Sequence, residues 1–214
     1  MQWILQIPAL FFAIIIHEFA HGYVAYRKGD DTAYLSGRLT LNPIPHIDPI
    51  GTLLLPAISL ITGAPLIGWA KPVPVNPYNM NDPYRDMVWV SAAGPFANIT
   101  VSFFSALCVT IFHLIELNKF FILIPFIYIF HYLIYINLIL AFFNLFPLYP
   151  LDGGQILLNI LPYRWREKYE RVIPYSMYII IFLILTGLIK YWIILPMNLV
   201  LKFYSFMGLK IVPF

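Results

Sequence analysis

Three residues near the N-terminus have the types and spacing needed for metal chemistry: His17, Glu18 and His21 form the pattern H-E-x-x-H. On a helix, side chains four positions apart project from one face, so the two imidazoles can bind a single Zn²⁺. The glutamate between them can act as a general base on water. Composition alone predicts roughly 0.002 such matches per chain of this kind. A metal site is therefore favoured over polar groups that only hold helices together by hydrogen bonds.

A third zinc ligand must come from elsewhere, because catalytic zinc sites typically use three protein ligands and a water molecule. Five side chains offer a suitable atom: His46, Asp48, His113, His131 and Asp152. Asp152 stands in FNLFPLYPLDGG, where two prolines end an apolar segment and two glycines allow a sharp turn. Taken alone, Asp-Gly-Gly after a proline is an ordinary turn.

The elements that must position these residues belong to a membrane protein. Of the 214 residues, 61% are hydrophobic and 11% are charged, whereas a water-soluble domain is about 25% charged. The net charge of +3 is too small and too scattered for a nucleic-acid surface. The composition predicts an all-α polytopic protein in the lipid bilayer, with residues 1–214 as one integral domain. Residues 1–160, which hold the candidate metal-binding residues, are expected to be its catalytic core.

Five segments approach the roughly 20 apolar residues that a membrane-spanning helix needs. They are residues 3–26, 87–114, 120–146, 172–189 and 192–207, the last two being the C-terminal membrane helices within residues 172–210. Residues 51–69 are also apolar, but prolines and glycines interrupt them, which favours a re-entrant segment shielded by protein. The alternative is a sixth span.

Loop charges distinguish these two topologies, because cytoplasmic loops carry an excess of Lys and Arg. If residues 51–69 span the membrane, four of the ten basic loop residues lie on one side and six on the other. If residues 51–69 are re-entrant, nine lie on one side and only Lys119 lies on the other. The re-entrant topology obeys this rule and predicts a cell-membrane protein whose N-terminus lies outside the cell. The first and third spans then run parallel, so HEFAH and Asp152 both lie toward the cytoplasmic side.

Two further regions are candidates for substrate contact. Residues 37–49 alternate apolar and polar side chains before a run of prolines, which suggests a short β-hairpin or extended segment whose edge could pair with an unwound substrate strand. Asn144 could steady a developing oxyanion, or it could form an ordinary hydrogen bond between helices. Asn98 is assigned to packing of the second span.

Three motifs together resemble the site-2 protease family of intramembrane zinc metalloproteases: HEFAH, SAAGPFAN at residues 91–98, and FNLFPLYPLDGG at residues 143–154. The similarity is greatest to the short bacterial and archaeal type without PDZ or CBS domains, which shares the NPIPHIDPIGTLLLP and GWAKPVPVNP stretches. The resemblance implies that His17, His21 and Asp152 bind zinc and that Glu18 is the catalytic base. It also implies that Asn144 binds substrate near the metal.

The predicted function is cleavage of a transmembrane segment in another membrane protein by a zinc-dependent endopeptidase. The substrate segment would have to unwind locally, which Gly, Pro or Asn in it would ease. One alternative is a membrane metal-binding or transport protein, although the other spans offer few polar groups for an ion path. A second alternative is an inactive relative that only holds its membrane partner, in which Glu18 would have no use.

Overall fold

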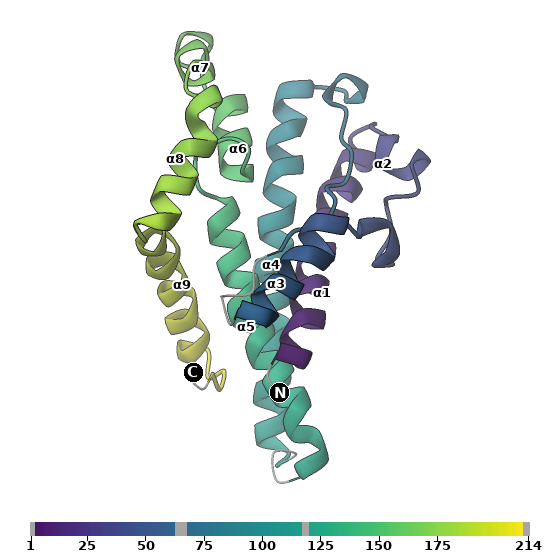
Figure 1. The fold of residues 1–214 in the computed structure, drawn as a ribbon, viewed down its shortest axis with the longest axis vertical. Coiled ribbons are helices and arrows are strands. Elements are labelled where there is room, and N and C mark those ends of the chain that lie inside the picture. The colour runs from purple at the N-terminus through teal and green to yellow at the C-terminus, as the bar shows by residue number, and fades with distance from the viewer. Residues whose placement is uncertain (1–2, 63–67, 117–119, 212–214) are drawn as a thin grey trace.

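Three long helices form the centre of the protein, and the computed structural model describes residues 3–62, 68–116 and 120–211. The helices that are long and apolar enough to cross a membrane lie within α1 (Trp3–Arg27), α4 (Pro83–Leu114) and α5 (Ile124–Asn144). Helix α4 packs against both α1 and α5 and runs opposite to them (Figure 1). Helices α1 and α5 are therefore parallel, and both end on the same side of the bundle.

Small and branched apolar side chains hold α4 and α5 together. Ala106 and Val109 of α4 pack against Ile134 and Leu138 of α5, and all four are fully buried. Tyr204 of α9 (Ile189–Phe206) joins the same cluster. Small residues at a helix interface let the two backbones approach closely, which is how membrane helices gain packing energy without a hydrophobic driving force between them.

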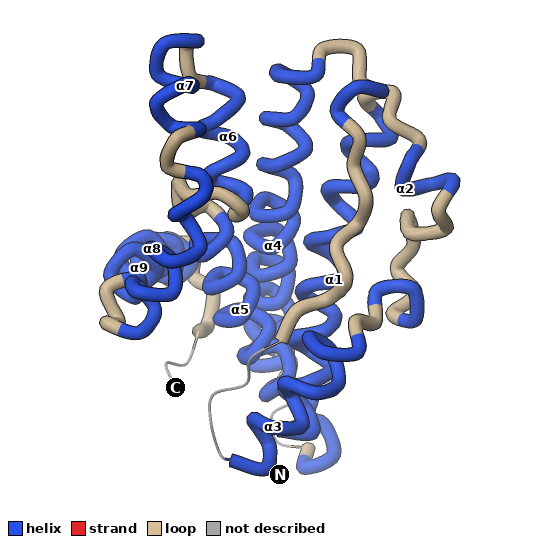
Figure 2. Tube along the Cα trace, turned by 45° about the horizontal axis from the view of Figure 1, so that its top comes forward, coloured by secondary structure: helices blue, strands red, loops and turns tan. Residues whose placement is uncertain are grey.

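The described residues contain helices and loops but no strand, as Figure 2 shows. Residues 37–49 form bends and the short η1 (Ile44–His46), so the expected hairpin is not confirmed. Pro43, Pro45 and Pro49 lack the N–H groups that a β-ladder requires. The other short elements between α1 and α5 are α2 (Thr32–Leu35), η2 (Pro49–Leu54), α3 (Leu55–Thr62), η3 (Pro77–Asn79) and η5 (Phe121–Leu123).

The two ends of the apolar segment 51–69 lie against each other. The Trp69 N–H donates to the Gly51 carbonyl at 3.1 Å, and the Thr52 hydroxyl donates to the Trp69 carbonyl at 3.0 Å. Residues 63–67 of this segment are outside the described part of the chain. Helix α3 has 8 residues and is thus about 12 Å long, far short of a bilayer core of about 30 Å.

The C-terminal region differs from the expectation of two further spans. Helix α6 (Asp152–Ile160) and α7 (Tyr163–Glu170) lead into α8 (Ile173–Leu185), which meets α9 at an angle of 74°. With 13 residues, α8 is only about 20 Å long. The bend follows Gly187, whose φ of 71° suits glycine. The count of five spans is not confirmed: the described residues give three spans, or four if α8 and α9 together form one.

Candidate metal centre

Helix α1 presents the H-E-x-x-H residues in its C-terminal half. His17 and His21 are one turn apart, and their Nε2 atoms are separated by 3.1 Å. His17 is buried, and the His21 side chain is 12% exposed. The two imidazoles therefore point their Nε2 atoms toward one place inside the bundle, as the i and i+4 spacing predicts.

Asp152 reaches the same place from the first turn of α6. Its Oδ2 atom lies 3.1 Å from His17 Nε2, and its Oδ1 atom lies 3.3 Å from His21 Nε2. The following Gly153 sits so close to the Leu145 carbonyl that a Cβ atom would overlap it. A glycine at this position thus lets α6 begin directly against the end of α5, which brings the carboxylate to the imidazoles.

The outward-facing nitrogen of each imidazole contacts a hydrogen-bond acceptor. His21 Nδ1 lies 2.7 Å from the Val90 carbonyl, which can only accept, so this nitrogen carries the proton. His17 Nδ1 lies 2.5 Å from Asn98 Oδ1, while the amide nitrogen of Asn98 donates to the Ala13 carbonyl and to Asn137 Oδ1. In the neutral form, imidazoles protonated at Nδ1 would direct the lone pair of Nε2 at Asp152.

This arrangement of lone pairs fits a divalent cation. Among the residues that the structure describes, His17, His21 and Asp152 form the group whose ligand atoms all lie within 4.8 Å of one another. Two lone pairs and a carboxylate repel each other unless a positive charge lies between them. Tetrahedral zinc with bonds of roughly 2.0–2.1 Å to nitrogen places its ligand atoms about 3.3 Å apart. The separations of 3.1 to 3.3 Å match this value.

Glu18 and Asn144 border a cavity of about 200 Å³ next to His17. Glu18 Oε2 accepts a hydrogen bond of 2.8 Å from the Val73 N–H, in the loop that runs beside α1 (Figure 2). Asn144 donates from Nδ2 to the Leu140 carbonyl one turn earlier in α5. The cavity thus brings a carboxylate, an amide and one of the three clustered side chains to a single space.

The other sequence candidates for a third ligand lie elsewhere. His46 bonds through Nε2 to the Thr40 carbonyl, and Asp48 accepts N–H groups at the start of η2. His131 Nδ1 bonds to the Ile127 carbonyl within α5, and His113 belongs to the last turn of α4. Asp152 is therefore the one of the five that the fold brings to His17 and His21.

Sequence reasoning missed the amides behind the imidazoles. Asn98 and Asn137 are both fully buried, and Asn137 in turn donates to the Leu133 carbonyl. The sequence pattern assigns Asn98 to packing of the second span and does not single out Asn137. A usable signal was present, because Asn137 lies seven residues before Asn144 and so on the same face of one apolar helix. An amide inside a membrane helix needs a partner there.

The apolar helices and the cluster of two histidines with a carboxylate define a class, a helical membrane protein with a candidate metal site. Residues 108–187 match the family described as Peptidase family M50. The chain is 38% identical over 205 residues to "Putative zinc metalloprotease YwhC" of Bacillus subtilis, and the alignment covers 92% of this chain and 89% of that protein. The chain belongs to peptidase family M50, the site-2 protease family, in its short form.

A more distant relative matches part of the chain. "Putative zinc metalloprotease Rip2" of Mycolicibacterium smegmatis is 33% identical over 101 residues, which is 47% of this chain and 38% of that protein. No solved structure gives a significant match. The expected zinc dependence is confirmed by these comparisons, and they support intramembrane proteolysis as the general function.

Proposed function

We propose that the protein is a zinc-dependent endopeptidase that cuts a transmembrane segment of another membrane protein, with His17, His21 and Asp152 as the zinc ligands. The observation that carries this proposal is the convergence of the two Nε2 atoms on the Asp152 carboxylate, next to a cavity that Glu18 borders. The neutral tautomers that Asn98 and Val90 fix are the ones that bind a metal.

Glu18 acts as the general base in this mechanism. When bound, zinc supplies a Lewis acid that polarises the scissile carbonyl and activates water. Glu18 takes the proton from the attacking water and returns it to the leaving amine. The hydrogen bond from the Val73 N–H holds the carboxylate at the cavity while it does so. The Asn144 amide, which also lines the cavity, donates to the oxygen on which negative charge develops.

The substrate enters from the bilayer as a helix and is cut in an extended form. A helix hides its carbonyls in its own hydrogen bonds, so a segment weakened by Gly, Pro or Asn is favoured. The cavity of about 200 Å³ is far too narrow for a helix of 10–12 Å diameter. Local unwinding therefore precedes cleavage.

The active site faces the cytoplasmic side of the cell membrane in this proposal. The hydrogen bonds between Gly51 and Trp69 support a re-entrant segment, because its two ends lie at one level. The loop after α1 and the basic helix α7 lie at the same end of the bundle (Figure 1), as the positive-inside rule favours for a cytoplasmic end. Residues 1–160 form the catalytic core of one membrane domain, and residues 172–210 support it.

The proposal is tested with purified protein in liposomes that also contain single-span model substrates. Glu18→Gln should retain zinc and lose about 10²- to 10⁴-fold in cleavage rate, since it removes only the base. Asp152→Ala should lose both zinc and cleavage. Equal cleavage by wild type and Glu18→Gln, or full zinc content in Asp152→Ala, would contradict the assignment.

A further inference from the structure

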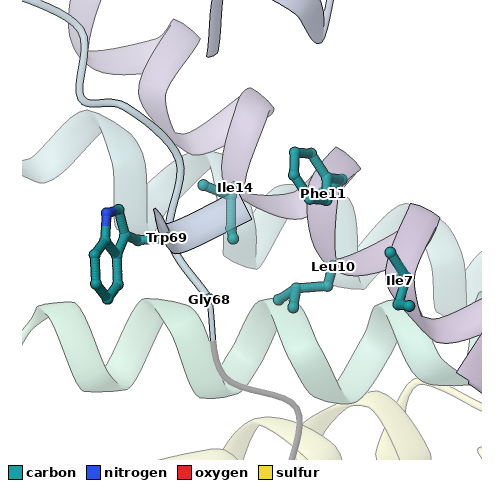
Figure 3. Close-up of a pocket in the computed structure, with 7 residues that line it drawn as sticks. Ile7, Leu10, Phe11, Ile14, Gly68 and Trp69 are labelled. Atoms are coloured by element: carbon teal, nitrogen blue, oxygen red, sulfur yellow. The ribbon is translucent and has the colours of Figure 1, made fainter. Parts of the chain in front are cut away.

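A small apolar groove of about 10 Å³ on α1 adjoins the catalytic cavity (Figure 3). Its α1 wall consists of residues spaced as i, i+3, i+4 and i+7, which puts them on one helix face: Ile7, Leu10, Phe11 and Ile14. Gly51, Gly68 and Trp69 complete the lining. In the figure, the α1 side chains form a row from Ile7 to Ile14, and Trp69 lies at the Ile14 end.

The groove and the catalytic cavity share part of their walls. Ile14, Gly68 and Trp69 line both spaces, and beyond them the cavity continues to His17 and Glu18. All seven groove residues are apolar or glycine, whereas the cavity contains the polar groups. An apolar segment that reached the cavity along this face of α1 would pass Trp69 beside the general base.

Trp69 is fixed at this junction by its own backbone and by Gly51. Its N–H and carbonyl both form hydrogen bonds, to Gly51 and Thr52 at 3.1 and 3.0 Å. Its indole lies directly on Gly51, where an added Cβ atom would come within 2.5 Å of the ring atoms Cγ and Nε1. The ring thus has no room to retreat toward Gly51 when a large side chain passes.

We propose that Trp69 determines substrate specificity by restricting the residues next to the scissile bond to small ones such as Gly, Ala and Ser. This inference rests on the proposed protease function. The cavity beyond the indole is about 200 Å³, below the roughly 300–1,000 Å³ of typical ligand pockets. Where an apolar wall such as the indole confines a substrate side chain, each extra methylene changes the rate by about 10- to 200-fold.

The test compares single-span substrates that differ only at the two residues flanking the cut, with Ala, Val, Leu or Phe there. Wild type should cleave the Ala substrate at least about tenfold faster than the Phe substrate. Trp69→Ala should reduce this ratio, mainly by raising the rate for Phe, with zinc content unchanged. Trp192→Ala is the matched control, since Trp192 is another exposed tryptophan, bonded to the Phe142 carbonyl of α5.

Gly51→Ala provides an independent arm. Its new methyl group displaces the indole, so the ratio of the cleavage rates for the Ala and Phe substrates should change. In the Trp69→Ala background the same substitution should have no effect, because the indole contacts are gone. If Trp69→Ala does not retain zinc, Trp69→Leu takes its place in both arms.

Two results would overturn the inference while leaving the protease function intact. One is an unchanged Ala-to-Phe ratio in a Trp69 variant that still cleaves in a Glu18-dependent manner. The other is an equal loss for all substrates, which is what a tryptophan serving only as a membrane anchor would give. Absence of Glu18-dependent cleavage in wild type would instead overturn the proposed function itself.

Discussion

In the helices around the candidate metal centre, polar side chains are buried and bonded to one another, whereas in the C-terminal helices large apolar side chains face outward. Asn98 and Asn137 are fully buried between α4 and α5, while Phe182 and Leu185 of α8 are 59% and 81% exposed. Hydrogen bonds between specific atoms permit only one arrangement of helices. Contacts between apolar side chains and lipid are compatible with many arrangements of helices. Substitutions in the two regions should therefore affect different properties.

The largest effect is expected from Gly94→Ala in α4. A Cβ atom at Gly94 would lie 2.6 Å from the Cε1 atoms of both His17 and His21, so the imidazoles must move. We expect the zinc affinity to fall by more than about 100-fold, the upper end for changes behind the ligands. Titration with a zinc-competing chelator measures this. Phe104→Ala, on the exposed face of the same helix, is the control and should leave the affinity unchanged.

A smaller loss of zinc affinity is expected from Asn98→Ala. The substitution removes the acceptor for His17 Nδ1, so the imidazole is no longer held in the metal-binding tautomer. The zinc affinity should fall by about 10- to 100-fold. Asn137→Ala should reduce the affinity less, because Asn137 contacts Asn98 and not the imidazole. Equal affinities for wild type and Asn98→Ala would show that the amide contributes only to packing.

Features that depend on local sequence spacing could be predicted, whereas contacts that depend on how helices pack could not. The imidazole pair follows from helical spacing alone, and the long helices follow from apolar length. The contact between Asn98 and His17 depends on how α1 packs on α4, which no local pattern specifies. At the C-terminus, apolar length predicts two spans, but α8 has only 13 residues and meets α9 at 74° across a break that contains Gly187.

Asp30 should affect stability rather than zinc. It is fully buried outside the membrane spans and accepts hydrogen bonds from Thr32, Asn76 and Asn79. Burial alone would raise its pKa, but these hydrogen bonds outweigh burial and hold the pKa below its ordinary value. Asp30→Asn should lower the free energy of unfolding by about 1.5–3 kcal/mol, which is the typical contribution of a hydrogen bond to a charged group.

The stabilisation by Asp30 should also depend on pH. A lowered pKa stabilises the folded state fully above the unfolded-state pKa of about 3.9, and this contribution is lost as the pH falls through the folded-state value. Thermal unfolding in detergent should therefore show wild type and Asp30→Asn converging below about pH 4. A constant difference between them from pH 7 to pH 3 would contradict this explanation.

The smallest effect is expected from Phe182→Ala in α8. The side chain is mostly exposed and lies outside the metal centre and its hydrogen bonds. Zinc affinity and the cleavage rate of a single-span substrate should stay within about twofold of wild type, since surface substitutions usually change stability by less than 0.5 kcal/mol. A loss as large as that of Asn98→Ala would remove the distinction between the two regions.

The position of Asp152 has a consequence for biosynthesis. Because α6 follows all three long helices, the carboxylate leaves the ribosome only after α1, α4 and α5 have been made. If Asp152 completes the zinc site, a partly translated chain holds the general base but not the full metal site. The nascent chain is then unable to hydrolyse its neighbours at the insertion machinery, and hydrolytic capacity arises only once the bundle has assembled.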